Sequence, residues 1–392
     1  MKKTVKDVDV SNKMVFVRVD FNVPLENRQV QDDSRIKASL PTIEYLSKNA
    51  ARTVLVTHLG RPDGKVVEEY RVDPVAKKLE ELMGKKIQKL DYVDPMYIRE
   101  DLDQVKPGEI IMLENVRFLA GEENCDENLA KGWAELVDIY VNDAFGTAHR
   151  AHASTYGLAK EVEAVAGLLM DKELKFFGDL MDSPERPFVA ILGGAKIGDK
   201  IGVIESLMKK VDKILIGGGM ANTFLAAKGF DLGNSYVEET VLNVAEDLIK
   251  EAEYSGIQMV LPFDVVVTKS LEDEEQDSYQ VKVGEISTGE MAVDIGDETV
   301  DIFSHIISDA KTVIMNGPMG IFETSPYHEG TVKVAKAIAA CDGFTVVGGG
   351  DSAAAMKKAG VEEEISHIST GGGATLKFLQ GNKLPGVEVL MD

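Results

Sequence analysis

Short apolar runs, rich in β-branched residues and mostly closed by a polar residue or a glycine, recur along this chain of 392 residues. They occupy 14–20, 53–58, 109–115, 138–143, 188–194, 213–219, 258–264, 312–317 and 344–350. Stretches with helical periodicity lie between them, at 34–48, 126–136, 199–210, 238–253 and 328–340. Apolar strands that alternate with helices predict parallel sheets covered on both faces. Because ligands of such sheets bind beyond the carboxyl ends of the strands, the residues that close each run are the candidates for chemistry.

Arginine and glycine divide the chain into two parts. No arginine follows Arg186, whereas every GGG triplet lies beyond it. The segment 181–188 carries two prolines, which suit a domain junction, and the stretch 171–181 before it predicts a connecting helix. The sequence therefore predicts an α/β protein of two Rossmann-like lobes, each a parallel sheet covered by helices, joined by a hinge helix.

Composition and charge limit the possible partners. The chain is 44% hydrophobic and 28% charged, enough apolar material for large cores, and its net charge of −23 disfavours nucleic acid and membrane surfaces. Its two cysteines, Cys125 and Cys341, are lone thiols far apart in sequence, and they give neither a disulfide framework nor the spacing of a metal site. The N-terminus lacks a signal-peptide pattern and no apolar stretch approaches transmembrane length, so we expect a cytoplasmic protein. The acidic run at 272–277 predicts a solvated loop.

Glycine-rich turns follow several predicted strands of the second part, at 193–195, 217–219, 348–351 and 370–373. Glycine lets the backbone approach a ligand closely, and a helix N-terminus offers N–H donors and a favourable dipole to phosphate. None of these turns matches a P-loop, and none has the context of a dinucleotide fingerprint, which argues against an NAD-dependent dehydrogenase. One such turn could simply join a strand to a helix, but several in one domain favour a nucleotide site.

Four charged residues near these turns each have a functional and a structural interpretation. Lys196 and Lys200 are spaced to lie on one helix face, where they could bind a polyphosphate or simply face solvent. Asp351 could hold Mg²⁺ beside nucleotide phosphates or cap a helix. Glu323 could accept hydrogen bonds from a ribose or lie in an exposed loop.

Polar and basic residues stand at or just after strand ends of the first part: Asp20, Asn22, Arg35, His58, Arg61, Arg117 and Arg150. If the sheet is parallel, these strand ends share one edge and the side chains can converge on one small ligand. The planar guanidinium fork binds two oxygens at once, so this edge is predicted to bind a carboxylate or a phosphate. Surface ion pairs are the alternative for each arginine taken alone. His58 could be a neutral donor, a cation or a purely structural residue.

Eight motifs of the chain resemble, in order and over essentially its whole length, the motif series of phosphoglycerate kinases. They are RVDFNVP (18–24), HLGRP (58–62), LENVRF (113–118), NDAFGTAHRAHAST (142–155), ILGGAKIGDKI (191–201), NGPMGIFE (316–323), GGGDSAAA (348–355) and STGGGAT (369–375). The resemblance implies an enzyme that catalyses the reversible reaction of 1,3-bisphosphoglycerate and Mg-ADP to 3-phosphoglycerate and Mg-ATP.

The resemblance also implies roles for individual residues. Binding of the acid falls to Asp20, Phe21, Asn22, Arg35, His58, Leu59, Gly60, Arg61, Arg117 and Arg150. Binding of the nucleotide falls to Lys196, Lys200, Gly217, Gly218, Ala292, Glu323, Gly349, Gly350, Asp351 and Ser352, with Asp351 on Mg²⁺. Arg35, Lys196, Gly372 and Gly373 would act on the phosphoryl group in transfer. At Ala292 relatives often carry glycine, which puts that nucleotide contact in doubt.

By the same resemblance, residues 1–172 form the acid-binding lobe, 173–187 the connecting helix and hinge, and 188–373 the nucleotide-binding lobe, with the tail 374–392 packing back on the first. We expect closure about the hinge, small-molecule substrates only, and a monomer. In the ATP-consuming direction the nucleophile is a carboxylate that is ionised at neutral pH, so the reaction needs no general base. The alternative is a non-catalytic two-lobed binding protein for an anionic metabolite.

Overall fold

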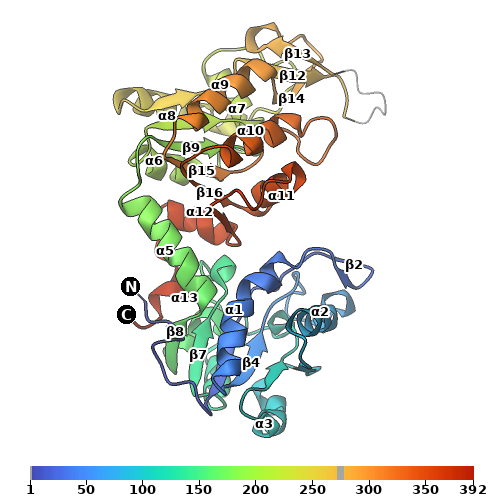
Figure 1. The fold of residues 1–392 in the computed structure, drawn as a ribbon. Coiled ribbons are helices and arrows are strands. Elements are labelled where there is room, and N and C mark those ends of the chain that lie inside the picture. Colours follow the sequence, from blue (N-terminus) through green and yellow to red (C-terminus); the bar gives the residue numbers. More distant parts are fainter. Residues whose placement is uncertain (1, 272–277) are drawn as a thin grey trace. The chain divides into compact units, whose positions relative to one another are not determined.

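The computed structural model describes residues 2–271 and 278–392, so the acidic run expected to form a loop, 272–277, lies outside the described residues. The chain divides into two compact units. The first unit comprises the residues up to Lys175 together with Lys383–Asp392, and the second unit comprises Phe176–Asn382. Figure 1 shows the first unit mainly in blue to green and the second in green to red.

The first unit is built on a parallel sheet with strand order β5-β6-β4-β1-β7-β8. Its strands are β1 (Met14–Arg18), β4 (Arg52–Val56), β5 (Gln88–Lys89), β6 (Ile110–Met112), β7 (Ile139–Asn142) and β8 (Glu163–Ala166), and a small hairpin pairs β2 (Leu25–Glu26) with β3 (Gln29–Val30). Every residue of β1 is buried, as expected of a strand covered on both faces.

The helices of the first unit lie around this sheet (Figure 1). They are α1 (Ser34–Lys48), α2 (Asp73–Met83), α3 (Pro95–Gln104), α4 (Glu127–Ala134), α13 (Pro385–Glu388) and the start of α5 (Leu168–Asp182). In α1, Ile36, Ile43 and Leu46 are buried at helical spacing and join the core that the strands form.

The second unit contains a parallel sheet in the order β11-β10-β9-β15-β16-β17 and a separate antiparallel sheet in the order β13-β12-β14. The strands are β9 (Phe188–Leu192), β10 (Lys213–Ile216), β11 (Gln258–Val260), β12 (Asp264–Thr268), β13 (Tyr279–Lys282), β14 (Met291–Ile295), β15 (Thr312–Asn316), β16 (Phe344–Gly348) and β17 (His367–Ser369). In the parallel sheet the strand order reverses between β9 and β15, which is where such sheets bind ligands.

The helices of the second unit begin near the carboxyl ends of these strands or connect them back to the sheet. They are α6 (Ile201–Met208), α7 (Gly218–Ala227), α8 (Leu242–Tyr254), α9 (Asp297–Ser308), α10 (Glu329–Ala339), α11 (Gly350–Ala359) and α12 (Gly373–Leu379). Side chains of β9, β15, α9 and α10 form a continuous core. A smaller core lies under the antiparallel sheet.

The predicted fold class is confirmed, since each unit has its own parallel sheet flanked by helices. One predicted strand is wrong, because the run 258–264 does not form a single strand. Its first residues form β11 of the parallel sheet, which ends at Val260, and Asp264 begins β12 of the antiparallel sheet. A buried proline at Pro262 separates the two strands, and its missing N–H cannot continue a ladder. The antiparallel β13-β12-β14 sheet as a whole was not predicted; its strand β13 is mostly exposed and so lacks the continuous apolar run that marks the buried parallel strands.

The return of the chain to the first unit begins later than expected. We predicted it at 374, but 374–379 belong to α12 of the second unit, where Leu379 is fully buried, and the return begins at Lys383. From there the backbone N–H of Gly386 donates to Ala148 O at 2.9 Å and that of Met391 to Ala164 O at 2.9 Å. The connecting helix α5 also starts earlier than the predicted 173, at Leu168, and the units divide within it.

No helix in the part of the chain that the structure describes has both the length and the apolar character needed to cross a bilayer.

Candidate functional site

In the first unit, hydrogen bonds join the segments that follow three neighbouring strands. Arg35 Nη1 donates to Asp20 Oδ2 at 3.1 Å and to the carbonyl oxygen of Asn22 at 3.2 Å. The backbone N–H of Gly60 donates to Asn22 Oδ1 at 2.9 Å, and Arg117 Nη1 donates to Gly60 O at 2.7 Å. Five of the predicted acid-binding residues therefore form one connected group at the carboxyl edge of the sheet.

His58 follows β4 and is buried at the same edge. Its Nδ1 lies 3.2 Å from Arg18 Nη2 and 3.8 Å from Asp20 Oδ1. Burial lowers the pKa of His58 well below its usual range, and the positive charges of surrounding arginines, Arg18 and Arg117 foremost, lower it further. His58 is therefore neutral at physiological pH, which argues against the cation among its three interpretations.

Two other residues predicted at this site, Phe21 and Leu59, are buried and contribute through the backbone. The N–H of Phe21 donates to Thr57 Oγ1 at 2.9 Å, and that of Leu59 donates to Asn115 Oδ1 at 3.2 Å. Their side chains belong to the apolar core of the unit. They hold the strand-end segments in place, and only their main chain lies near the polar group.

Arg61 and Arg150 are the more accessible arginines of the predicted set. Arg61 is exposed and makes no hydrogen bond or ion pair with any residue that the structure describes. Arg150 is half-buried, and its Nε lies 3.2 Å from His149 Nε2. A guanidinium without a protein carboxylate keeps its donors available to an incoming anion.

A buried polar network beneath this edge was not predicted. Arg18 is 1% exposed and its Nε donates to Ser154 Oγ at 2.8 Å, while Ser154 Oγ donates to Glu122 Oε1 at 2.6 Å. The N–H of Ser154 donates to Glu122 Oε2 at 2.9 Å. The signal in the sequence is the strand period, because Arg18 lies two residues before Asp20 and a strand presents such residues on one face.

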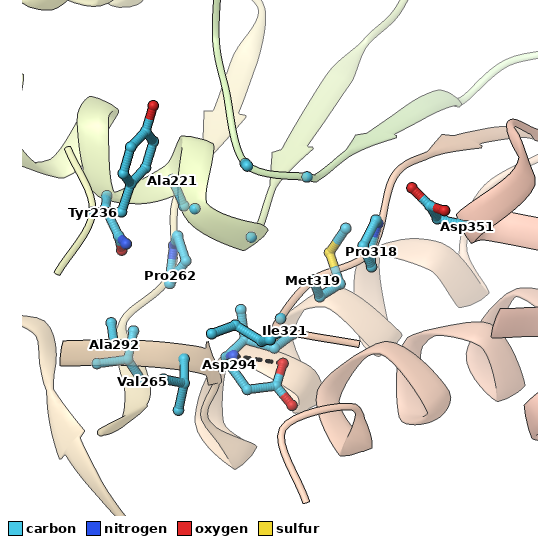
Figure 2. A pocket seen from close by; sticks show the side chains of 18 of the residues that line it. Ala221, Tyr236, Pro262, Val265, Ala292, Asp294, Pro318, Met319, Ile321 and Asp351 are labelled. Carbon is cyan, nitrogen blue, oxygen red and sulfur yellow. Dashed lines mark hydrogen bonds between the residues drawn. The ribbon is translucent and has the colours of Figure 1, made fainter. Parts of the chain in front are cut away.

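The second unit has a cavity of about 350 Å³ at the reversal point of its parallel sheet (Figure 2). The turns after β9, β10 and β15 line one part of it, and residues of β12 and β14 line another. Four of the predicted nucleotide-binding residues line it directly: Gly218, Ala292, Glu323 and Asp351. Glu323 and Asp351 are exposed, and Figure 2 shows the Asp351 carboxylate at the end of the cavity opposite Tyr236.

Two glycines of the turn after β10 cannot be replaced without displacing the cavity wall. Gly218 has a φ of +66°, and a Cβ there would lie 2.6 Å from the backbone nitrogen of Gly194. A Cβ at Gly217 would lie 2.4 Å from the sulfur of Met319. The turn therefore needs glycine because three backbone segments approach closely here.

The predicted pairing of Lys196 and Lys200 on one helix face is wrong. The helix α6 begins only after Lys200, so Lys196 lies in the preceding turn, exposed and without a hydrogen bond or ion pair among the described residues. Lys200 is buried, and its Nζ donates to Gly193 O at 2.6 Å and to Asn316 Oδ1 at 2.8 Å. Burial lowers the pKa of Lys200 to about 8, against the weaker effect of Asp351 and Asp199, which raise it.

The start of α11 brings the predicted residues 349–352 next to the β15 turn. Gly349 is the residue before the helix and has a φ of +99°, so the alternative of Asp351 as a helix cap is wrong. Ser352 is buried, and its Oγ accepts from the N–H of Gly317 at 2.7 Å. Gly372 and Gly373 form the start of α12 and are absent from the cavity lining.

The cavity wall also contains residues that the sequence did not indicate. Asp294 is 5% exposed and accepts from the N–H of Ile295 at 2.9 Å, shown in Figure 2, and from the N–H of Gly330 at 2.7 Å. Burial raises the pKa of Asp294 to about 7. Tyr236 and Asn222 line the same cavity. None of these residues belongs to a glycine turn, so only the folded chain connects them to the site.

Comparisons with known proteins show which family the chain belongs to. The family model for phosphoglycerate kinase matches residues 5–382. A phosphoglycerate kinase of Pelotomaculum thermopropionicum is 51% identical over 100% of this chain and 99% of the relative, and one of Moorella thermoacetica is 52% identical with the same coverage.

The solved structure of phosphoglycerate kinase from Coxiella burnetii superposes with a TM-score of 0.88 at 36% identity, over 99% of this chain and 98% of that one. That of Pyrococcus horikoshii OT3 gives a TM-score of 0.87 at 35% identity, over 100% and 98%. Family model, relatives and folds agree over nearly the full length, and this chain therefore belongs to the phosphoglycerate kinase family.

Proposed function

We propose that the two units divide between them the reversible phosphoryl transfer of glycolysis, which this chain catalyses as a member of its family. In that reaction 1,3-bisphosphoglycerate and ADP give 3-phosphoglycerate and ATP. The first unit binds the acid at its basic strand edge, and the second binds the nucleotide in its glycine-lined cavity. The observation that carries this proposal is that one unit has an arginine-rich sheet edge and the other has a cavity lined by glycine turns.

At the acid site, Arg61, Arg117 and Arg150 anchor the distal phosphate of the substrate, and Arg35 faces its carboxylate. Arg61 has its donors free, whereas Arg35 is oriented by Asp20 and Asn22. Neutral His58 adds a hydrogen-bond donor or acceptor without adding charge. Arginine suits this task because it binds two oxygens of a carboxylate or phosphate in a fixed geometry.

At the nucleotide site, backbone N–H groups of the glycine turns and the Lys200 ammonium bind the phosphates, and Glu323 binds the ribose. The first turns of α7 and α11 add the favourable end of the helix dipole. Gly217, Gly349, Gly350 and Ser352 shape these turns.

Mg²⁺ accompanies the nucleotide, and the residues present fit it. Asp351 is an exposed carboxylate at the cavity, and Mg²⁺ usually takes only one or two protein carboxylates while phosphates and waters supply the rest. Within residues 2–271 and 278–392 no group of three or more His, Cys, Asp or Glu side chains could hold a metal alone. Bound Mg²⁺ neutralises phosphate charge, and Asp351 is the residue that would hold it.

The reaction requires stabilisation of negative charge and no proton transfer. The transferred phosphoryl group passes through a loose, negatively charged state. Arg35 and Lys196 carry that charge in our proposal, together with the backbone amides of Gly372 and Gly373. Lys196 is exposed without a protein partner, so its ammonium is free to reach a transferring group. The acceptor carboxylate is already ionised at neutral pH, which explains why neither site needs a general base.

A coupled assay tests the proposal directly. The chain is incubated with ATP, Mg²⁺ and 3-phosphoglycerate. A dehydrogenase then reduces the acyl phosphate formed with NADH, and the fall in NADH absorbance is recorded. Turnover that requires both substrates supports the proposal. Tight binding of the acid without turnover would instead support the non-catalytic binding protein, which family membership does not favour. We also propose that the enzyme acts as a cytoplasmic monomer, which sedimentation analysis and cell fractionation can test.

A further inference from the structure

We propose that Glu123 competes with the acid for Arg117: its carboxylate occupies the guanidinium in the free chain, and the phosphate of the acid displaces it on binding. The inference rests on the acid site proposed above and adds a residue that lowers the affinity of that site. Glu123 is not one of the residues predicted from the sequence.

Arg117 is held firmly by the first unit, yet one of its donors lacks a well-aligned acceptor. The side chain is 4% exposed, and its Nη1 donates to Gly60 O at 2.7 Å. Its Nε is buried and lies 3.1 Å from Glu123 Oε1, but it makes no hydrogen bond with any residue that the structure describes. The contact is therefore an ion pair in which the N–H of Nε does not point at the carboxylate oxygen. A phosphate oxygen in line with this N–H would make the stronger bond.

Two carboxylates lie within ion-pair distance of the predicted acid-binding arginines in the part of the chain that the structure describes, and they differ in how easily they can move. The side chain of Asp20 is 8% exposed, and its Oδ2 accepts from Arg35 Nη1 at 3.1 Å. The side chain of Glu123 is 42% exposed. A half-exposed carboxylate regains water when it turns away from its partner, whereas separating a buried pair leaves a charge without compensation. We therefore expect exchange with a ligand at Arg117 and not at Arg35.

The backbone next to Glu123 is fixed, so the exchange needs only the rotation of one side chain. Glu122 is fully buried, and its Oε1 accepts from Ser154 Oγ at 2.6 Å. The carbonyl oxygen of Glu122 accepts from the N–H of Ala153 at 2.9 Å. Rotation of an exposed side chain is fast and requires no movement of the loop. After it leaves Arg117 the carboxylate stays close to the acid site, where its charge opposes the bound anion.

The balance of charge around Arg117 explains why the free chain keeps this ion pair. Burial lowers the pKa of Arg117, the Glu123 carboxylate raises it, and the positive charges of Arg150 and Arg18 lower it again. Glu123 thus compensates a buried positive charge when no ligand is bound. A phosphate carries about two negative charges at neutral pH, against one on the carboxylate, so it compensates the same charge better. Glu123 therefore stabilises the empty site and weakens binding of the acid.

The first experiment measures the affinity of the full chain for 3-phosphoglycerate and for inorganic phosphate by isothermal titration calorimetry. Glu123→Gln should lower the dissociation constant of both ligands about fivefold, the factor that corresponds to an ion pair of this exposure. Glu127→Gln is the matched control, because it removes the same charge from the exposed pair of Glu127 and Lys131, at 3.5 Å, and should leave both constants unchanged. A role of Glu123 in orienting Arg117 predicts the opposite sign. Weaker binding in Glu123→Gln, or an unchanged constant, would overturn the proposal.

The second experiment compares crystal structures of the full chain without ligand and with 3-phosphoglycerate. Glu123 Oε1 should lie within about 4 Å of Arg117 Nε without ligand and farther away in the complex, with a phosphate oxygen in its place. A complex in which the ion pair persists would refute the displacement. A chain that turns over in the coupled assay but gives these contrary results loses only this inference, whereas absent turnover removes the proposed function.

Discussion

Nucleotide binding should weaken steeply above pH 8 because of a single buried lysine. Lys200 is 9% exposed, and its ammonium donates to neutral oxygens of Gly193 and Asn316. No carboxylate among the described residues lies within ion-pair distance of it, and burial lowers its pKa to about 8. A nucleotide phosphate would supply the missing negative charge and so bind the protonated form more tightly than the neutral one.

The size of the effect follows from this pKa. If bound phosphate keeps Lys200 protonated, the apparent dissociation constant of ADP is inversely proportional to the fraction of the free chain in which Lys200 is protonated. Between about pH 7 and about pH 9.5 that fraction falls enough to weaken binding about 30-fold, or about 2 kcal/mol. The phosphates of ADP are already ionised at the lower end of this range, so they contribute little to the change.

Calorimetric titration of ADP at constant Mg²⁺ across this pH range is the test. Lys200→Met should bind ADP more weakly at neutral pH and should lose most of the pH dependence, since it has no proton to release. Lys209→Met is the matched control, because Lys209 lies exposed at the end of α6 and should leave the pH profile unchanged. The reasoning would be refuted if Lys200→Met retained the full pH dependence of the original chain.

Three further predictions concern the two units. Arg35→Ala should lower kcat about 100-fold or more, as loss of a donor to the transition state does, whereas Arg61→Ala should mainly raise the KM of the acid about 10-fold; equal, small effects in steady-state kinetics would contradict this division. Burial raises the pKa of Asp294 to about 7, so the folded chain binds a proton there more tightly than the unfolded chain does. The stability that this proton contributes is present below about pH 4 and is lost as the pH rises to about 7. As the pH rises from about 5 to about 8, the free energy of unfolding of Asp294→Asn, measured in urea titrations, should therefore increase by about 3 kcal/mol relative to that of the original chain. Parallel pH profiles of the two chains would rule this out. Asn142→Ala removes the 2.9 Å bond from Asn142 Nδ2 to Gly386 O and should cost about 1–3 kcal/mol, with earlier proteolysis of the C-terminal return as the readout; an unchanged cleavage rate would show that other contacts hold the tail.

The parallel sheets were predictable because their strands are short, apolar and bounded by clear breaks. The buried runs at β1 and β9 need no knowledge of their neighbours, since a strand covered on both faces is apolar along its whole length. The residues that close these runs were predictable for the same reason: once strands are parallel, their carboxyl ends lie at one edge. This argument alone brought Asp20, His58 and Arg117 to one place.

Properties that depend on burial could not be read in this way. Lys196 and Lys200 look equivalent in sequence, yet one is exposed and the other is enclosed by the turns after β9 and β15. Whether His58 carries a charge was likewise undecided until the arginines around it were placed, because desolvation and nearby charge both set its pKa.

The sequence alone predicted the two parallel sheets, the basic edge, the glycine turns and the resemblance to a kinase family. Each of these depends on a local pattern of residues or on the order of motifs along the chain. Only the tertiary structure decided that residues of β12 and β14 line the cavity of the second unit and that Asn222 and Tyr236 line it too. Local pattern fixes which backbone conformation a segment prefers. Which side chains then lose water, and which distant groups they face, depends on packing between segments that are far apart in the chain.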